Sequence, residues 1–93
     1  MFSYEFSEEL KLKIKKLVKK DKKRSEIVYK KVKEIINNDA STISRYENLK
    51  YDMSNLKEVH IAKSFVLTFK VDINNNFILF VDLEHHDVIF PRW

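Results

Sequence analysis

All three histidines lie late in the chain, at positions 60, 85 and 86. Histidine is the side chain whose unperturbed pKa, roughly 6.5, lets it accept and donate a proton near neutral pH. His85 and His86 also open the last segment of the chain, which closes on Pro91-Arg92-Trp93. In a chain of net charge +4, imidazoles gathered at one end of a small sheet indicate acid–base chemistry on an anion, with RNA as the leading candidate.

The same residue types suit zinc, which His60, His85, His86 and Asp87 could bind. Adjacent histidines at the end of a strand point to opposite sides, however, so both rarely reach one ion. The absence of cysteine removes thiolate ligands and disulfides. The absence of glycine excludes Gly-rich phosphate-binding loops. We therefore expect neither a metal site nor a cofactor.

A basic stripe covers residues 11–24, KLKIKKLVKKDKKR, which hold nine of the 18 basic residues and one acid, Asp21. Such a stripe attracts phosphates, an acidic partner or an anionic membrane surface. Any single lysine in it fits equally well on a solvated helix face. The clustering as a whole favours an anionic partner.

The first part of the chain predicts a strand and two helices. Phe2, Tyr4 and Phe6 alternate with polar residues, which is the period of a strand with one buried face. Ser7 and Asp21 are suited to cap two successive helices. Their apolar residues recur at helical spacing, with Leu10, Ile14, Leu17 and Val18 in the first and Val28, Val32, Ile35 and Ile36 in the second. We expect an antiparallel helical hairpin that ends at Asn37-Asn38-Asp39.

The second part predicts a loop and three strands. Residues 39–56 show no sustained period, so they predict a long connection with room for one helical turn, and such loops are often functional. Alternating apolar residues predict strands over residues 56–61, 65–71 and 77–83, with a hairpin turn at 72–76. Residues 1–93 thus form one α+β domain: an N-terminal strand, a two-helix hairpin and a three-stranded antiparallel meander. The helices cover one face of the sheet and leave the other partly open.

The sequence carries no sign of a membrane or secreted protein. No segment approaches the roughly 20 apolar residues that cross a bilayer. The N-terminus lacks a basic region followed by an apolar run, so we expect no signal peptide. We expect a cytoplasmic protein without a membrane partner.

Three segments resemble the RelE/ParE superfamily of small bacterial and archaeal toxins. YEFSEELKLKIKKLVKKD resembles the family's first strand and lysine-rich helix, and NLKYDMSNLKEVHIAKSFVLTFKV its core segment. FVDLEHHDVIF is similar to the closing strand and "HHDxxY/F" ending of RelE-like and YafQ-like members. The resemblance covers nearly the whole chain and implies a RelE-like fold.

The RNase branch of that superfamily cuts messenger RNA in the ribosomal decoding site without a metal, and each toxin is blocked by a cognate antitoxin. The resemblance implies the same activity and partners here. His60 matches a YafQ-like catalytic histidine, His86 the histidine after the last strand, and Phe90 an aromatic near the C-terminus. Glu47 falls where YafQ-like members carry a histidine and YoeB-like members a glutamate.

The chain departs from the family at several positions. Ser64 stands where YafQ-like toxins carry an aspartate, and Val66 where YoeB-like toxins carry an arginine. The usual loop glycine is replaced near Ser54 or Asn55. The basic residues that can substitute for those of RelE are Lys50, Lys63 and Arg92.

Metal-free RNA cleavage needs a base near the ribose 2′-oxygen, an acid near the 5′-oxygen and cations around the phosphorus. General acids and bases each contribute roughly 10²- to 10⁴-fold. Our hypothesis makes His60 or Glu47 the base and His86 the acid, with His85 outside the site. Lys50, Lys63 and Arg92 bind RNA and stabilise developing charge. Phe90 and Trp93 stack on a splayed base.

Three functions remain open at this stage. The leading one is a RelE-type toxin that acts on ribosome and mRNA as a monomer, held otherwise in a hetero-oligomeric complex with an antitoxin. The second is a ParE-like gyrase inhibitor, against which His60 and His86 count. The third is a ribosome- or RNA-binding member with decayed catalysis, which Val66 keeps open. An acidic antitoxin on the basic stripe should bind more weakly as salt rises.

Overall fold

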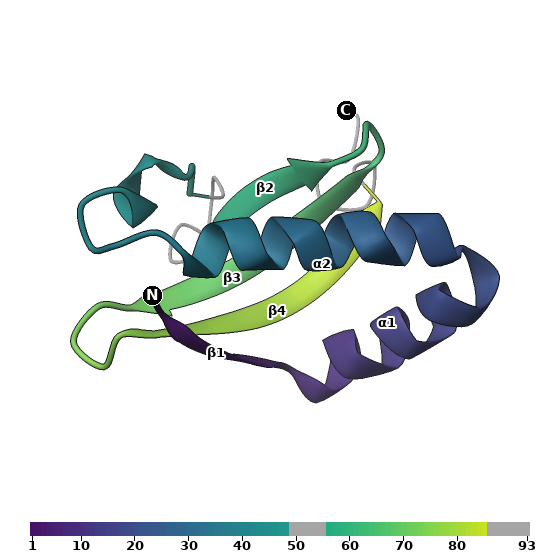
Figure 1. Cartoon of the computed structure of the whole chain (residues 1–93), viewed down its shortest axis with the longest axis horizontal. Helices are drawn as coiled ribbons and strands as arrows, with labels where there is room; N and C mark the ends of the chain where they lie inside the picture. The colour runs from purple at the N-terminus through teal and green to yellow at the C-terminus, as the bar shows by residue number, and fades with distance from the viewer. Residues whose placement is uncertain (49–55, 86–93) are drawn as a thin grey trace, which may run out of the picture.

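The computed structural model describes residues 1–48 and 56–85. Within them the order is β1 (Ser3–Phe6), α1 (Glu8–Lys20), α2 (Lys22–Ile36), a 3-10 turn η1 (Ile43–Arg45), β2 (Lys57–Ile61), β3 (Phe65–Asp72) and β4 (Phe77–His85). This order confirms the predicted strand, helical hairpin and meander (Figure 1). The last strand runs two residues further than predicted and takes in His85.

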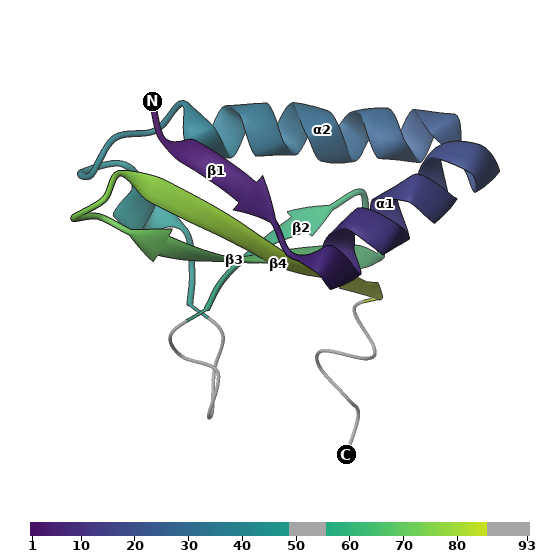
Figure 2. The ribbon, with the colours of Figure 1, turned by 90° about the horizontal axis from the view of Figure 1, so that it is seen from below.

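The four strands form one sheet in the order β1-β4-β3-β2. β2, β3 and β4 pair antiparallel as a meander, whereas β1 runs parallel to β4. Parallel neighbouring strands need a crossover connection. The segment that joins β1 to the meander provides it, and this segment contains the hairpin of α1 and α2. Figure 2 shows both helices on one side of the sheet.

Both helices begin where the sequence predicts. The Ser7 hydroxyl oxygen accepts a hydrogen bond from the Leu10 amide at 3.1 Å, and Glu8 and Glu9 occupy the first turn of α1. Asp21 ends α1 and caps α2, because its side chain accepts from the Arg24 amide at 3.1 Å. A single residue therefore joins the helices, which forces them into a tight hairpin.

The core lies between the helices and the sheet. Leu10 and Ile14 of α1 and four apolar residues of α2 meet the inward side chains of β3 and β4, which include Leu67, Phe69, Ile78 and Phe80. Two expectations were wrong: Tyr4 is 44% exposed and Val18 is 42% exposed. Tyr4 lies on an edge strand, where its ring packs on Phe6 and Phe80 from one side only. Val18 lines an open groove beside α1.

The first half of the predicted loop is well organised. The carboxylate of Asp39 accepts hydrogen bonds from the amides of Ser41 and Thr42, each at 2.9 Å, and from the Ser41 hydroxyl at 2.6 Å. The Ser41 hydroxyl and these amides lower the pKa of Asp39 to about 2. The turn η1 follows and buries Ile43 in the core. The prediction that this loop could hold one helical turn is thus confirmed.

No helix in residues 1–48 and 56–85 is both long and apolar enough to cross a membrane.

Candidate active site

His60 lies on β2, on the face of the sheet opposite the helices. Of its neighbours, Ile61 lies in the helix-covered core and Val59 packs against that core. Because side chains alternate between the two faces along a strand, His60 lies on the other face. The side chain of His60 is 51% exposed, so a ligand in solution can reach the imidazole.

A glutamate lies beside this histidine on the same face. The Oε1 atom of Glu58 is 3.8 Å from the Nε2 atom of His60, and the side chain of Glu58 is only 10% exposed. A mostly buried carboxylate next to an accessible imidazole resembles the support that acidic residues give to catalytic histidines. We therefore consider the two residues as a pair.

Strand register extends this pair into a polar patch. His60 is paired with Val66, which is paired with Glu84 of β4, and Glu58 is paired with Thr68, which is paired with Asp82. Paired residues share a face. Val66 and Thr68 of the middle strand β3 are buried. The imidazole and the carboxylates therefore lie on either side of these two buried residues.

Lys13 of α1 neutralises the β4 side of the patch. Its ammonium donates hydrogen bonds to Asp82 at 2.7 Å, to Glu84 and to the Leu83 carbonyl at 3.3 Å. Burial alone would lower the pKa of Lys13, but these hydrogen bonds and charges outweigh it, and the pKa is raised above its usual value. Asp82 and Glu84 are thus engaged by α1, while Glu58 contacts the histidine.

Lys63 lies at the turn between β2 and β3, just beyond His60. The turn begins at Ala62, whose φ of 53° lies in the left-handed region, where a Cβ atom crowds the carbonyl. Lys63 is exposed there, and its role in binding phosphate stays a prediction. Val66, at the position of the missing arginine, is apolar and fully buried, so it cannot contact a phosphate.

Glu47 is closer to this pair than a loop position suggests. Its carbonyl oxygen accepts a hydrogen bond from the Glu58 amide at 2.8 Å. The next residue, Asn48, forms an isolated antiparallel β-bridge with Lys57. Lys57 also donates to the Tyr46 carbonyl and to Asn48, each at 3.1 Å. Glu47 is exposed beside the start of β2, so it remains a second candidate base.

His85 lies on the opposite face from His60. It pairs with Phe65, and the two rings meet edge to face at 5.7 Å between centroids. The Arg24 guanidinium of α2 lies 4.9 Å from the same Phe65 ring, which marks this as the helix-covered side. His85 and His60 therefore do not share a site.

The other predicted site residues lie outside the described residues; they are Lys50, His86, Phe90, Arg92 and Trp93. Among the described residues, no three His, Asp or Glu side chains lie close enough together to hold a metal ion. Glu58 is the residue that sequence reasoning missed. Its signal was available, because a glutamate two residues from a histidine in a strand lies on the same face.

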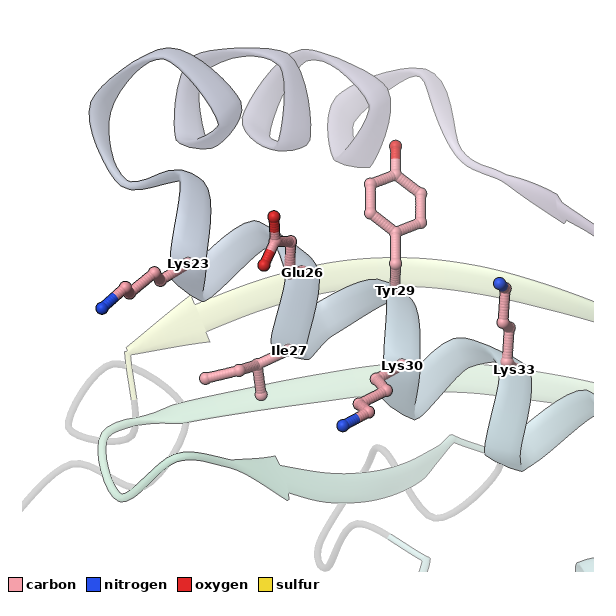
Figure 3. Close-up of a pocket in the computed structure, with 6 residues that line it drawn as sticks. All are labelled: Lys23, Glu26, Ile27, Tyr29, Lys30 and Lys33. Atoms are coloured by element: carbon pink, nitrogen blue, oxygen red, sulfur yellow. The ribbon is translucent and has the colours of Figure 1, made fainter.

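Two open grooves lie on the helical layer, and His60 lines neither of them. One runs along the outer surface of α2, where Figure 3 shows Ile27 and Tyr29 among lysines. The second lies between α1, α2 and β1, and it shares Tyr29 with the first. Its floor is formed by Phe6, Ile14 and Val18 and its rim by Lys11, Lys15 and Lys19. These grooves can receive an apolar surface with acidic edges.

Comparison with known proteins decides the family. No family model matches the chain. "Putative toxin RelE4" of Methanocaldococcus jannaschii is 41% identical over 92 residues, which cover 99% of this chain and 94% of that protein. An uncharacterized protein of Methanosarcina mazei is 42% identical over 90 residues, covering 97% of this chain and all of that protein.

The chain belongs to the RelE/ParE toxin superfamily. Solved structures share the fold of this toxin: YafQ of Escherichia coli matches with a TM-score of 0.71 and 18% identity, over 98% of this chain and all of YafQ. A metal-bound toxin of Helicobacter pylori matches with a TM-score of 0.74 and 23% identity, over 97% of this chain and all of the other. The resemblance to RelE-like toxins, and with it the toxin of a toxin–antitoxin system, is therefore confirmed.

Proposed function

We propose that this toxin is a ribosome-dependent endoribonuclease that cuts messenger RNA without a metal. The observation that carries the proposal is the pair of an accessible His60 and a mostly buried Glu58 on the face of a RelE-like sheet opposite the helices. Such a pair supplies a general base, which metal-free RNA cleavage requires. A toxin that acts on ribosomes works in the cytoplasm.

In this mechanism His60 takes the proton of the ribose 2′-hydroxyl as that oxygen attacks the adjacent phosphorus. The bond from phosphorus to the 5′-oxygen breaks, and the 5′-oxygen receives a proton from His86. Lys63, with Lys50 and Arg92, stabilises the negative charge that builds on the phosphoryl oxygens. Phe90 and Trp93 hold the base at the cut by stacking. We prefer His60 to Glu47 as base because Glu58 supports it.

The antitoxin binds the helical layer in our proposal. The groove between α1 and α2 joins an apolar floor to a lysine rim. An amphipathic helix with acidic edges complements both features, because its apolar face fills the floor and its carboxylates meet the lysines. The toxin then acts as a monomer once the complex releases it.

Primer extension on cellular mRNA after induction tests the proposed reaction. Cuts inside codons by a toxin that was stripped of bound metal with EDTA and then returned to the magnesium buffer that ribosomes need support a metal-independent RNase. Loss of cleavage by the stripped toxin, with recovery when zinc is added, would contradict metal independence; this outcome is worth testing because one structural neighbour is a metal-bound toxin. DNA damage without RNA cuts would instead indicate gyrase inhibition. Growth arrest with neither would indicate binding without catalysis.

A further inference from the structure

We propose that Glu58 is a positioning residue for His60, which sets the tautomer and orientation of the imidazole. The inference rests on the proposed function, in which His60 is the general base.

The exposure of the two side chains separates their roles. Glu58 is 10% exposed and His60 is 51% exposed, with 3.8 Å between Oε1 and Nε2. The carboxylate is thus largely covered, while the imidazole is accessible from the solvent from which RNA arrives. Glu58 is placed to act through His60, since its own carboxylate is largely covered.

The backbone of Glu58 is fixed on both sides. Its amide donates to the Glu47 carbonyl at 2.8 Å, and on the other side it pairs with Thr68 of β3. Thr68 is buried and donates to the Asp82 carbonyl at 3.4 Å. A carboxylate held by a braced backbone keeps one position, which a positioning group requires.

The chemistry follows from the nitrogen that faces the carboxylate. A proton on Nε2 directed at Glu58 leaves the lone pair on Nδ1, and this nitrogen accepts the proton of the 2′-hydroxyl. The ring becomes an imidazolium as the new bond from the 2′-oxygen to phosphorus forms. Glu58 stabilises that positive charge and keeps its own ionised state, as the acidic member of a catalytic triad does.

The other carboxylates of the patch do not take this role. Asp82 and Glu84 both form salt bridges with Lys13. Val66 of β3 lies between Glu84 and His60, because it is paired with both of them across the sheet. Glu84→Gln is therefore a matched control, because it removes a carboxylate from the same face without removing a neighbour of His60.

Single-turnover cleavage on mRNA-programmed ribosomes gives the first test. We expect Glu58→Gln to lower the maximal rate about tenfold to hundredfold, less than the roughly 10²- to 10⁴-fold that a whole general base contributes. The toxin concentration at half-maximal rate should change less than about twofold, because Glu58 does not hold the RNA. Glu84→Gln should keep the maximal rate. A Glu58→Gln toxin with the full rate overturns the proposal.

The double variant separates positioning from a structural role. If Glu58 acts through His60, Glu58→Gln should cost nothing further in a His60→Ala background. An equal loss in both backgrounds would mean that Glu58 supports the fold, and the positioning role would fail. If His60→Ala alone keeps the full rate, the assignment of the base fails as well, which distinguishes the two failures.

Ring nitrogen NMR tests the proposal without any activity. The ¹⁵N shifts of His60, assigned by comparison with His60→Ala, should show one tautomer protonated at Nε2 in the wild type. In Glu58→Gln they should move toward a mixture of tautomers, while those of Glu84→Gln stay as in the wild type. Identical shifts in Glu58→Gln and wild type would overturn the proposal.

Discussion

On the face of the sheet opposite the helices, the neighbours of each carboxylate decide what that carboxylate can do. Glu58 lies 3.8 Å from His60, whereas Asp82 and Glu84 both form salt bridges with the Lys13 ammonium. The three are alike in the sequence. Only the register of β2, β3 and β4 and the reach of Lys13 from α1 tell them apart.

Lys13 is the residue whose loss should cost the most stability among the lysines of α1. Lys13→Met leaves Asp82 and Glu84 side by side without their cation, so we expect the free energy of unfolding to fall by about 1–3 kcal/mol. Lys11→Met is the matched control, because its pair with Glu8 is exposed and such pairs contribute about 0–1 kcal/mol. Urea unfolding of both variants measures the difference. Equal stabilities would show that the Lys13 bonds contribute nothing.

The sequence predicted His60 but could not predict these partners. Histidine is recognisable by type and by its place in a family segment. The contacts of Lys13 join residues 69 and 71 positions apart, and no local pattern encodes such a distance. The position of Glu58 beside His60 could have been predicted from the strand period alone, since the two residues are two positions apart.

At the scale of elements, local chemistry predicted most of the boundaries. Ser7 and Asp21 cap the helices as expected, because their side chains satisfy amides that the helix leaves open. The burial of single residues was harder to predict. Tyr4 and Val18 obey the apolar period yet stay exposed, because β1 is an edge and α1 borders a groove.

The turn at Asp39 makes an element-scale prediction about pH. Its pKa is lowered to about 2, so the hydrogen bonds contribute fully above the ordinary value of 3.8 and are lost as pH falls toward the lowered value. The amide shifts of Ser41 and Thr42 should therefore stay constant down to about pH 3.

Asp39→Asn provides the control for this titration. It should remove the acid titration of the Ser41 and Thr42 amides and leave that of the Asn75 amide, which depends on Asp72. A midpoint at or above the ordinary carboxyl pKa in the wild type would contradict the hydrogen-bonded turn.

At the scale of the whole molecule, the two sides of the sheet carry different chemistry. The helical layer is lysine-rich with apolar grooves, and the other face carries His60 among acidic residues. The basic stripe, residues 11–24, lies in the helical layer, as its helical pattern in the sequence predicts. An antitoxin on the helical layer and RNA at His60 would thus use separate surfaces.

Charge reversal tests the antitoxin surface. Lys15→Glu with Lys19→Glu should weaken binding of the cognate antitoxin by about tenfold or more, about 1.4 kcal/mol, because both lysines line the groove. Lys70→Glu, an exposed change on β3, should leave the affinity unchanged. Titration calorimetry at low and high salt should also show that wild-type binding weakens as salt rises. An affinity independent of salt and of the reversal would contradict this surface.

The central claim is that His60 carries the chemistry of mRNA cleavage, and one measurement tests it most directly. Purified wild-type and His60→Ala toxins, stripped of bound metal with EDTA beforehand, are incubated with mRNA-programmed ribosomes in magnesium buffer, and cleavage is followed by primer extension under single-turnover conditions. We predict cuts within codons by the wild type and a rate lower by roughly 10²- to 10⁴-fold in His60→Ala, with ribosome binding retained. Equal cleavage by both toxins would contradict the claim.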